Sequence, residues 1–314
     1  MNDDVYAAID AQKIPAQESA GADGAAGGQD FDREAYIARK QAERDAVFSS
    51  LDEITERISS DPVAFRDYLD VMARFPYSAT NALLIFDQAP DATRLADFES
   101  WKRSGAQVKK GQHAISILEP GDEYTRPDGS IGTSYNIKHV FDEKQTTARH
   151  LEPRYPDTRT LLFTLIDQAP VDIKTVDSLQ GDNEYAHYDH NTKTIWATRD
   201  LSEQQLFKAL TVELAQAALA ARGGDYDHEA NRETALFAAY VVAGRYGADN
   251  SGLMPVLTPQ APQDDAKEVR KELSLIRDTA KTITDRVDKN LEAKQFLEAA
   301  PAPKHDKGER NDAR

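Results

Sequence analysis

YSATNALLIFDQAPDATRLADFESWKRSGAQVKKGQHAISIL, residues 77–118, is the stretch that decides the fold of the N-terminal half of this chain. Its first part places apolar residues at helical spacing and should end before Ala89-Pro90, because a residue that precedes proline disfavours the helical conformation. After this break we expect a short helix that carries Leu95, Phe98 and Trp101. The stretch therefore predicts two successive helices, first an apolar one and then a short one that carries aromatic residues.

Working outward, Gly105 should close the short helix as a left-handed cap, and alternating apolar residues from Ala114 to Leu118 predict a strand. The turn sequence Arg126–Ser130 should return the chain into a second strand through Tyr135–Phe141. Upstream, Asp61-Pro62 is typical of an N-cap followed by proline at the first helical position. We therefore predict an α+β domain with helices packed on a small, mostly antiparallel sheet.

Positive charge is concentrated in the same stretch. Between Trp101 and Gln112 there are four Lys or Arg residues and no Asp or Glu, whereas the 314-residue chain has a formal net charge of -16. A local positive patch on an acidic protein favours a polyanionic partner that is held at one place and released by salt. Indiscriminate wrapping of nucleic acid is disfavoured by the overall charge.

Length and composition restrict the other possibilities. The length favours two domains over one. The chain has no cysteine, which excludes disulfides, thiolate nucleophiles and cysteine-ligated metals. No segment approaches the roughly 18 apolar residues of a membrane span, and the first residues lack a signal-peptide pattern. We expect a cytoplasmic protein with no membrane contact.

The second half predicts a mainly helical domain with a hairpin. The hairpin is expected over Tyr188–Thr198, with its turn at His190-Asn191. Ser202 should cap a long helix that ends at Gly223-Gly224. A second helix, from about Glu229 to Tyr246, is rich in Ala and aromatic residues and should be buried.

Near the C-terminus, apolar residues at three-and-four spacing give a charged helix a narrow apolar stripe: Val269, Leu273, Ile276, Ile283 and Val287. The stripe either packs back on its own protein or serves self-association or a partner helix. The predicted organisation is a disordered tail (1–30), an N-terminal domain (31–146), a linker (147–158), a second domain (159–250), a Pro-rich linker (251–264), the charged helix (265–298) and a second tail (299–314).

An ordered set of motifs over the first domain resembles the N-terminal domain of the ArdC family of antirestriction proteins, also seen in LtrC-like proteins of conjugative elements. The motifs are Tyr77-Ser78 before Asn81–Leu84, Phe98 and Trp101 before Gly105, Val108–Gly111 before the Ile115/Ile117 strand, and Val140–Asp142 with Gln145-Thr146. The resemblance implies a module that binds single-stranded DNA when a plasmid or integrative element enters a new host.

The residues themselves are compatible with this role, because single-strand binders combine cations for phosphates with aromatic rings on which bases stack. The cations would be Lys102, Arg103, Lys109 and Lys110; the other candidate contacts are Tyr77, Trp101 and Asn81. Each has a structural alternative: a core role for the tryptophan, a solvated turn for the two adjacent lysines, and a brace on a neighbouring loop for the asparagine.

The second domain resembles the zincin-like metallopeptidase domain that commonly follows this module. In an active member, two histidines four residues apart share a helical face and hold zinc, and the glutamate between them acts on zinc-bound water. The same frame here reads Val212-Glu213-Leu214-Ala215-Gln216, and the position near Leu236 that would supply the third ligand is apolar. We therefore expect a pseudo-metallopeptidase with a vestigial Glu213, no metal and no cofactor.

Two alternatives remain at this stage. A relocated metal held by His187, His190 or His228 would restore a peptidase. Alternatively, the acidic surface and the C-terminal helix would bind a DNA-binding partner, for example a restriction or nuclease subunit, or mimic the target of that partner. The leading hypothesis is a single-stranded DNA-binding protein of a mobile element, with an antirestriction or DNA-protecting role.

Overall fold

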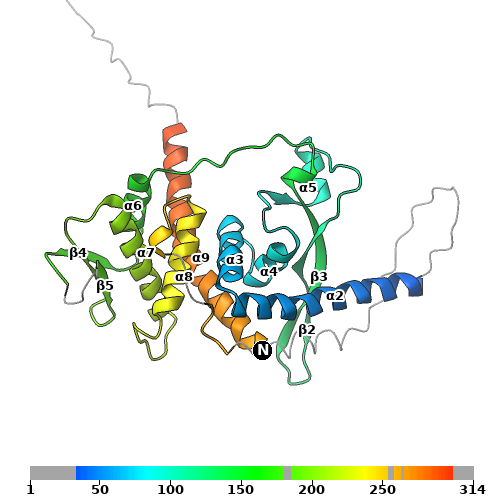
Figure 1. Ribbon diagram of the computed structural model, residues 1–314, viewed down its shortest axis with the longest axis horizontal. Coiled ribbons are helices and arrows are strands. Elements are labelled where there is room, and N and C mark those ends of the chain that lie inside the picture. The colour runs from blue at the N-terminus through cyan, green and yellow to red at the C-terminus, as the bar shows by residue number, and fades with distance from the viewer. Residues whose placement is uncertain (1–32, 180–184, 254–257, 263–264, 300–314) are drawn as a thin grey trace, which may run out of the picture. The chain divides into compact units, whose positions relative to one another are not determined.

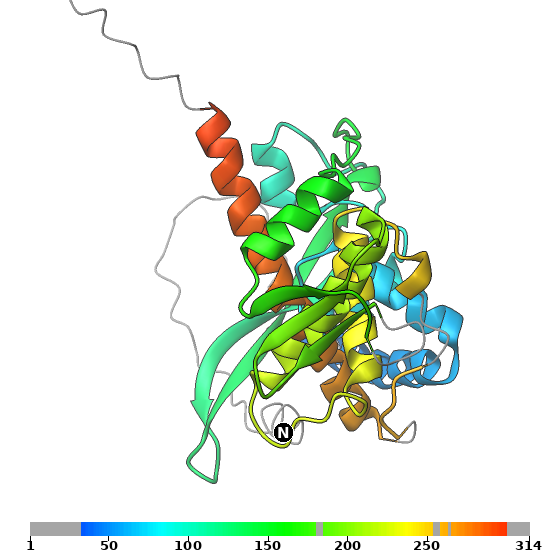
Figure 2. The ribbon, with the colours of Figure 1, turned by 90° about the vertical axis from the view of Figure 1, so that its left-hand side faces the viewer.

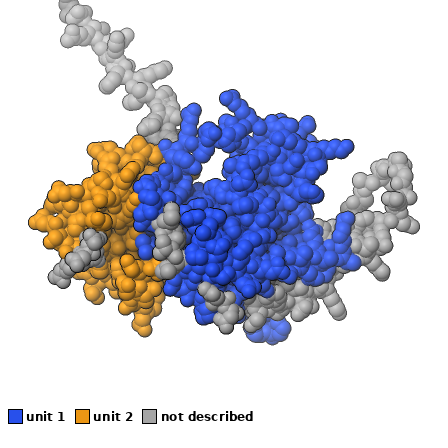
Figure 3. All heavy atoms as spheres, viewed as in Figure 1, with its two compact units in different colours: residues 1–155, 236–278 blue, residues 156–235, 279–314 orange. Residues whose placement is uncertain are grey.

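A computed structural model describes residues 33–179, 185–253, 258–262 and 265–299 of the chain (Figure 1). The predicted tails lie outside these residues apart from Ala299, as do parts of the Pro-rich linker. Contacts divide the chain into unit 1, residues 1–155 with 236–278, and unit 2, residues 156–235 with 279–314 (Figure 3). Each unit combines helices with a three-stranded sheet, which confirms the predicted α+β class.

Unit 1 begins with three helices, α2 (Arg33–Ser60), α3 (Pro62–Arg74) and α4 (Ala79–Gln88). The predicted cap between the first two is present: the Asp61 side chain accepts a hydrogen bond of 2.8 Å from the backbone N–H of Val63, and proline occupies the first helical position. These contacts satisfy backbone donors that a helix start leaves unpaired. The apolar faces of the helices form the core of the unit.

The sheet of unit 1 has the order β1-β3-β2 and is antiparallel throughout; its strands are β1 (Leu95–Ala96), β2 (Ile115–Thr125) and β3 (Ile131–Asp142). Figure 2 shows β2 and β3 side by side as a long ribbon. The turn between them lies at the predicted residues, with a φ of 84° at Gly129. Leu95 was expected in a helix, but it pairs with Asp142 as a strand.

The short helix α5 (Phe98–Arg103) starts later than predicted because its cap is Asp97, whose side chain accepts a hydrogen bond from the Ser100 N–H. Its end follows the prediction. Gly105 has a φ of 83°, and the N–H of Ala106 returns to the Trp101 carbonyl at 3.0 Å. This is the Schellman arrangement, in which glycine takes the left-handed position without a steric penalty.

Unit 1 also contains the 3-10 helices η1 (Glu143–Gln145) and η2 (Ser251–Leu253) and most of α8 (Arg232–Arg245). Phe237 packs edge-on against Phe65 with 5.0 Å between ring centroids, and the Tyr240 hydroxyl donates to Asp70 at 2.7 Å. The contact division thus places residues from Leu236 onward with unit 1, whereas the sequence-based bounds kept them in the second domain. Those bounds stay a prediction.

Unit 2 contains the helices α6 (Thr158–Asp167) and α7 (Glu203–Ala220) and a sheet with the order β4-β6-β5. Its strands are β4 (Asp172–Val176), β5 (Ala186–Asp189) and β6 (Thr194–Thr198). The hairpin of β5 and β6 was predicted, whereas the parallel pairing of β4 with β6 was not. The helix α7 packs against β5 and β6.

The start of α7 is fixed by a capping box. The Ser202 hydroxyl accepts from the Gln205 N–H at 3.3 Å, and the Gln205 side chain accepts from the Ser202 N–H at 3.0 Å. Past its end, Gly223 and Gly224 both have positive φ, which fits the predicted break. The cap fixes where the helix begins, and so its register along β5.

The helix α9 (Ala266–Ala299) buries its apolar stripe within the chain. Val269, Leu273 and Ile276 are buried in unit 1, and Ile283 and Val287 are buried in unit 2. The burial of the stripe therefore supports packing within the chain over self-association or binding of a partner helix. Among the described residues, no helix is both long and apolar enough to cross a membrane.

Candidate nucleic-acid interface and the zincin-like frame

The four predicted cations lie at the two ends of one tight loop. Lys102 and Arg103 form the last turn of α5, Lys109 and Lys110 follow the loop, and all four side chains are exposed. The backbone of the loop is held by η1, because the Lys109 N–H donates to the Gln145 carbonyl at 2.9 Å. Within the described parts of the chain, no carboxylate forms an ion pair with any of these four cations.

Trp101 points away from solvent. Its side chain is 3% exposed, and its indole N–H donates to the Phe141 carbonyl at 2.9 Å. The Arg94 guanidinium lies 4.8 Å from the ring centroid and also pairs with Glu143 at 2.8 Å. A ring covered in this way has no open face for a base. Trp101 therefore fixes α5 on the sheet, which is the structural alternative considered from the sequence.

Asn81 is also internal. Its amide donates to the Leu118 carbonyl at 2.7 Å and accepts from the Leu118 N–H at 2.8 Å. Gln88, two helical turns later on α4, makes the same pair of hydrogen bonds with Ser116, at 2.9 and 2.8 Å. The two side chains brace α4 against β2. The geometry thus matches the bracing alternative for Asn81, and Gln88 was not singled out from the sequence.

Tyr77 is half-buried at the entry to α4. Its carbonyl accepts from the Arg277 guanidinium at 3.0 Å, and its ring lies 6.1 Å from that of Phe75. Burial raises the pKa of its hydroxyl; the Lys138 ammonium opposes this shift and the Asp97 carboxylate adds to it. Since Asp97 caps α5, these influences indicate that Tyr77 lies near the start of that helix.

Phe98 is the aromatic residue of α5 that faces solvent, with 51% of its surface exposed. It precedes Lys102 by four residues, so the two side chains share a helical face. Trp101, not Phe98, was the ring on this helix predicted to contact DNA. The signal available was the N-cap at Asp97, which places Phe98 at the first helical position. We refer to Phe98, Lys102, Arg103, Lys109 and Lys110 as the α5 surface.

A hollow of about 730 Å³ lies beside this surface, within unit 1. It is lined by residues on both sides of the loop, among them Gly111, His113 and Lys144. Lys144 pairs with Asp91 at 2.7 Å, and this contact lowers the pKa of the aspartate. None of the four predicted cations lines the hollow. The four cations are therefore exposed side chains outside the wall of this hollow.

In unit 2 the frame that would carry a zincin site is closed by internal hydrogen bonds. Glu213 is buried, and its Oε2 accepts from the Tyr188 N–H at 2.7 Å and lies 3.0 Å from Nε2 of His228. Gln216 donates to the His228 carbonyl at 2.9 Å and accepts from the Tyr226 hydroxyl at 3.0 Å. We refer to Val212–Gln216 with Tyr188, Tyr226 and His228 as the Glu213 frame.

This donor set does not fit a catalytic metal ion. Val212 offers no lone pair, and both polar atoms of the Gln216 amide are engaged inside the protein. The rings of His187 and His228 are in tilted contact with centroids 4.6 Å apart, and the His190 ring is in tilted contact with that of Tyr226 at 4.9 Å. Across the residues that the structure covers, no three His, Cys, Asp or Glu side chains gather as metal ligands.

Comparison with known proteins identifies the class of the N-terminal domain, which contains the α5 surface and η1. Residues 52–154 match the N-terminal domain of anti-restriction factor ArdC. This match confirms, for residues 52–154, the resemblance to the ArdC family seen in the sequence motifs. No curated protein sequence matches the chain.

Two solved structures of the antirestriction protein ArdC from the R388 plasmid are similar to this chain. The metal-free structure has 17% sequence identity and a TM-score of 0.44, and the alignment covers 68% of this chain and 86% of that one. The Mn(II)-bound structure has 16% identity and a TM-score of 0.45, with coverage of 67% and 85%.

Proposed function

We propose that this protein binds single-stranded DNA through the α5 surface and so protects the DNA of a mobile element, or blocks its restriction, on entry into a new cell. The observation that carries the proposal is the combination of an exposed Phe98 with four cations that have no ion-pair partner among the described residues, inside an ArdC-type domain. Tyr77 is a second candidate ring near the same helix.

The preference for a single strand follows from what each group can bind. Lys and Arg contact phosphates of either form of DNA, whereas an exposed ring needs a base that is free to leave its neighbours. Stacking on such a ring is worth roughly 1–3 kcal/mol per base. Because the rest of the chain is acidic, only a strand that reaches these residues gains from binding.

The internal residues support the surface without touching DNA. Trp101 fixes α5 on β3, and the Lys109 ammonium donates to the Lys144 carbonyl at 2.9 Å, which limits the reach of that side chain. Lys110, with no such contact among the described residues, is the more adaptable phosphate ligand. A rigid loop loses little conformational entropy when a strand binds, so it strengthens binding.

We further propose that unit 2 has no metallopeptidase activity. Glu213, the residue at the general-base position, is held by a backbone N–H and by His228 and is buried. Val212 and Gln216 replace the imidazoles that would hold zinc. The test is zinc content after purification without chelator: stoichiometric zinc would contradict this part of the proposal.

The DNA proposal is tested by fluorescence anisotropy with a labelled single-stranded oligonucleotide and its duplex. The test variant is Lys109→Glu with Lys110→Glu, and the matched control is Lys271→Glu with Lys281→Glu, which changes the net charge equally on the exposed face of α9. We expect single-strand binding to fall at least about tenfold in the test variant and less than about twofold in the control. Equal losses in both variants, or no preference for the single strand, would overturn the proposal.

A further inference from the structure

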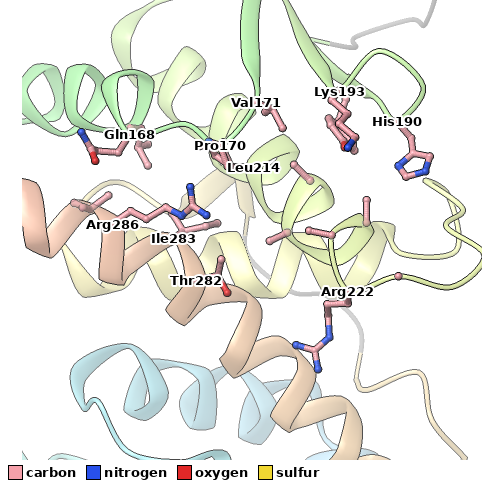
Figure 4. Close-up of a pocket in the computed structure, with 18 residues that line it drawn as sticks. Gln168, Pro170, Val171, His190, Lys193, Leu214, Arg222, Thr282, Ile283 and Arg286 are labelled. Atoms are coloured by element: carbon pink, nitrogen blue, oxygen red, sulfur yellow. The ribbon is translucent and has the colours of Figure 1, made fainter.

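Unit 2 contains a pocket of about 540 Å³ that the proposed function does not use (Figure 4). All of its lining residues belong to unit 2; they come from α6, the loop before β4, the β5–β6 hairpin, α7 with the turn that follows it, and the second half of α9. Pockets for small molecules usually measure about 300–1,000 Å³. The pocket is therefore large enough for an organic ligand.

The pocket shares Tyr188 and Leu214 with the Glu213 frame, but Glu213, Gln216 and His228 do not line it. On α7 it is lined by Leu214, Ala217, Ala218 and Ala220, and Ala221 lines it just past the end of the helix. Leu214 and Ala218, four residues apart, share one face of the helix. Val212 and Gln216 share the opposite side, because a helix turns by about 100° per residue. A ligand here would not occupy the position of a zincin metal.

The floor of the pocket is apolar and roomy because its α7 residues are leucine and alanines. Four alanines, at 217, 218, 220 and 221, leave space that larger side chains would fill, and Ile283 and Val287 of α9 also line the pocket. Leu165 of α6 adds to the same surface. Burying an apolar body against such walls is favourable by about 25 cal/mol per Å². The floor thus selects an apolar group without selecting a charge.

The rim of the pocket is cationic. Lys193, Arg222 and Arg286 line it from three different elements, and no Asp or Glu is among the lining residues (Figure 4). All three side chains are exposed, and in the described portion of the chain none of them forms a salt bridge. On a chain with a net charge of -16, three such cations around one opening indicate an anionic group at the rim.

The backbone at Lys193 adds an independent observation. Its φ is 51°, in the left-handed region where glycine is favoured and a side chain is disfavoured by about 1 kcal/mol or more. The strand pairing does not require a lysine at this turn. Strained residues of this kind concentrate where a side chain is needed for binding. Lys193 is one of the residues that line the pocket (Figure 4).

We infer that this pocket binds a small amphiphilic anion, with an apolar body on the alanine floor and a single carboxylate, phosphate or sulfonate group between Lys193, Arg222 and Arg286. The apolar body supplies most of the affinity, and the cations select charge and orientation. Binding at this site is independent of the DNA proposal, since the α5 surface lies in unit 1 and every lining residue lies in unit 2.

The probe for this inference is 8-anilinonaphthalene-1-sulfonate, a fluorescent aromatic anion, titrated into the full-length protein. Its displacement is then followed with decanoate below its micelle concentration, with decanol and with inorganic phosphate. We expect decanoate to displace the probe at least about tenfold more effectively than decanol, because only decanoate pairs with the rim. Phosphate alone should displace it poorly, because it has no apolar body.

Three variants localise the binding. Lys193→Gly removes a rim charge while relieving the left-handed backbone, so we expect several-fold weaker binding together with an unchanged or higher Tm. Ala218→Leu fills the floor and should also weaken binding. Lys289→Gln on α9, outside the lining residues, is the matched control and should bind as the unchanged protein does.

Equal displacement by decanol and decanoate would overturn the inference, as would an unchanged affinity in both Lys193→Gly and Ala218→Leu. Weaker binding in Lys289→Gln to the same extent as in Lys193→Gly would also overturn it, because the effect would then be one of overall charge. Since Lys193→Gly is expected to fold at least as well as the unchanged protein, its result does not depend on a damaged fold.

Discussion

The α5 surface and the Glu213 frame use the same kinds of side chain in opposite ways. In the α5 surface the cations and Phe98 are exposed to solvent, and the loop between the cations is held partly by backbone hydrogen bonds such as that from the Lys109 N–H to Gln145. In the Glu213 frame the carboxylate, the amide and the imidazole are hydrogen-bonded to one another and to the backbone. A surface that is to bind a ligand keeps polar groups available, whereas a frame whose polar groups are satisfied internally serves the fold.

The largest effect is expected from charge reversal in the α5 surface. Lys109→Glu with Lys110→Glu should reduce the affinity for a single-stranded oligonucleotide by about tenfold to a hundredfold. The slope of log K against log salt should also become shallower by about 1.4, since each phosphate contact contributes roughly 0.7 for single strands. Anisotropy titrations at several salt concentrations measure both quantities. An unchanged slope would show that these lysines do not contact phosphate.

The next effect concerns the Glu213 frame and should appear in stability alone. Glu213→Ala leaves the buried N–H of Tyr188 and the His228 ring without their acceptor, which should cost about 2 kcal/mol of unfolding free energy. Urea denaturation measures this change. DNA affinity should stay within about twofold. A variant of full stability that lost DNA binding would reverse the roles assigned to the two regions.

A smaller and more selective effect is expected for Phe98→Ala. Because the ring is exposed, its loss should leave the unfolding free energy within about 0.5 kcal/mol of the original. Single-strand affinity should fall by roughly tenfold, as one stacked base is worth about 1–3 kcal/mol. Duplex binding should not change. Trp101→Ala is the contrasting variant: it removes a buried ring and should destabilise the protein.

The smallest expected effect is a pH dependence of the protein's stability that comes from the pair of His150 and Glu143. The hydrogen bond from His150 to Glu143, at 2.6 Å, raises the pKa of the imidazole above its ordinary value of 6.5. A raised folded pKa stabilises the protein fully below about pH 6.5, and the contribution disappears as the pH rises through the folded value. Thermal melts from pH 5 to 9 should show this small loss, and His150→Asn should remove it. An identical profile in the variant would assign the dependence to another group.

Much of the fold follows from local rules in the sequence. The cap at Asp61, the left-handed Gly105 and the turn at Gly129 each depend on a few neighbouring residues, and each lies where it was predicted. The strand β4 was missed because Asp172–Val176 is short and partly polar, and its parallel partner β6 lies some twenty residues further along the chain. Local periodicity carries no information about such a pairing.

The candidate site was only partly predictable for the same reason. Sequence spacing showed that Phe98 and Trp101 lie on the same short helix, but which ring is buried depends on where β3 approaches it. Likewise, the acceptor role of Glu213 depends on His228, which reaches it from a loop beyond the end of α7. The charges at 102–110 required no tertiary contact to be recognised, because a run with four Lys or Arg and no Asp or Glu is visible in the sequence itself.

The hydrogen bonds of the Asn81 and Gln88 amides also affect how strand β2 can associate with other molecules at high protein concentration. The strand β2 is at the margin of its sheet, where unpaired backbone groups would accept a strand from another molecule. At Ser116 and Leu118 those groups are occupied by the two amides. Further along, Pro120 and the acidic residues after it hinder pairing. These features therefore hinder edge-to-edge aggregation through β2.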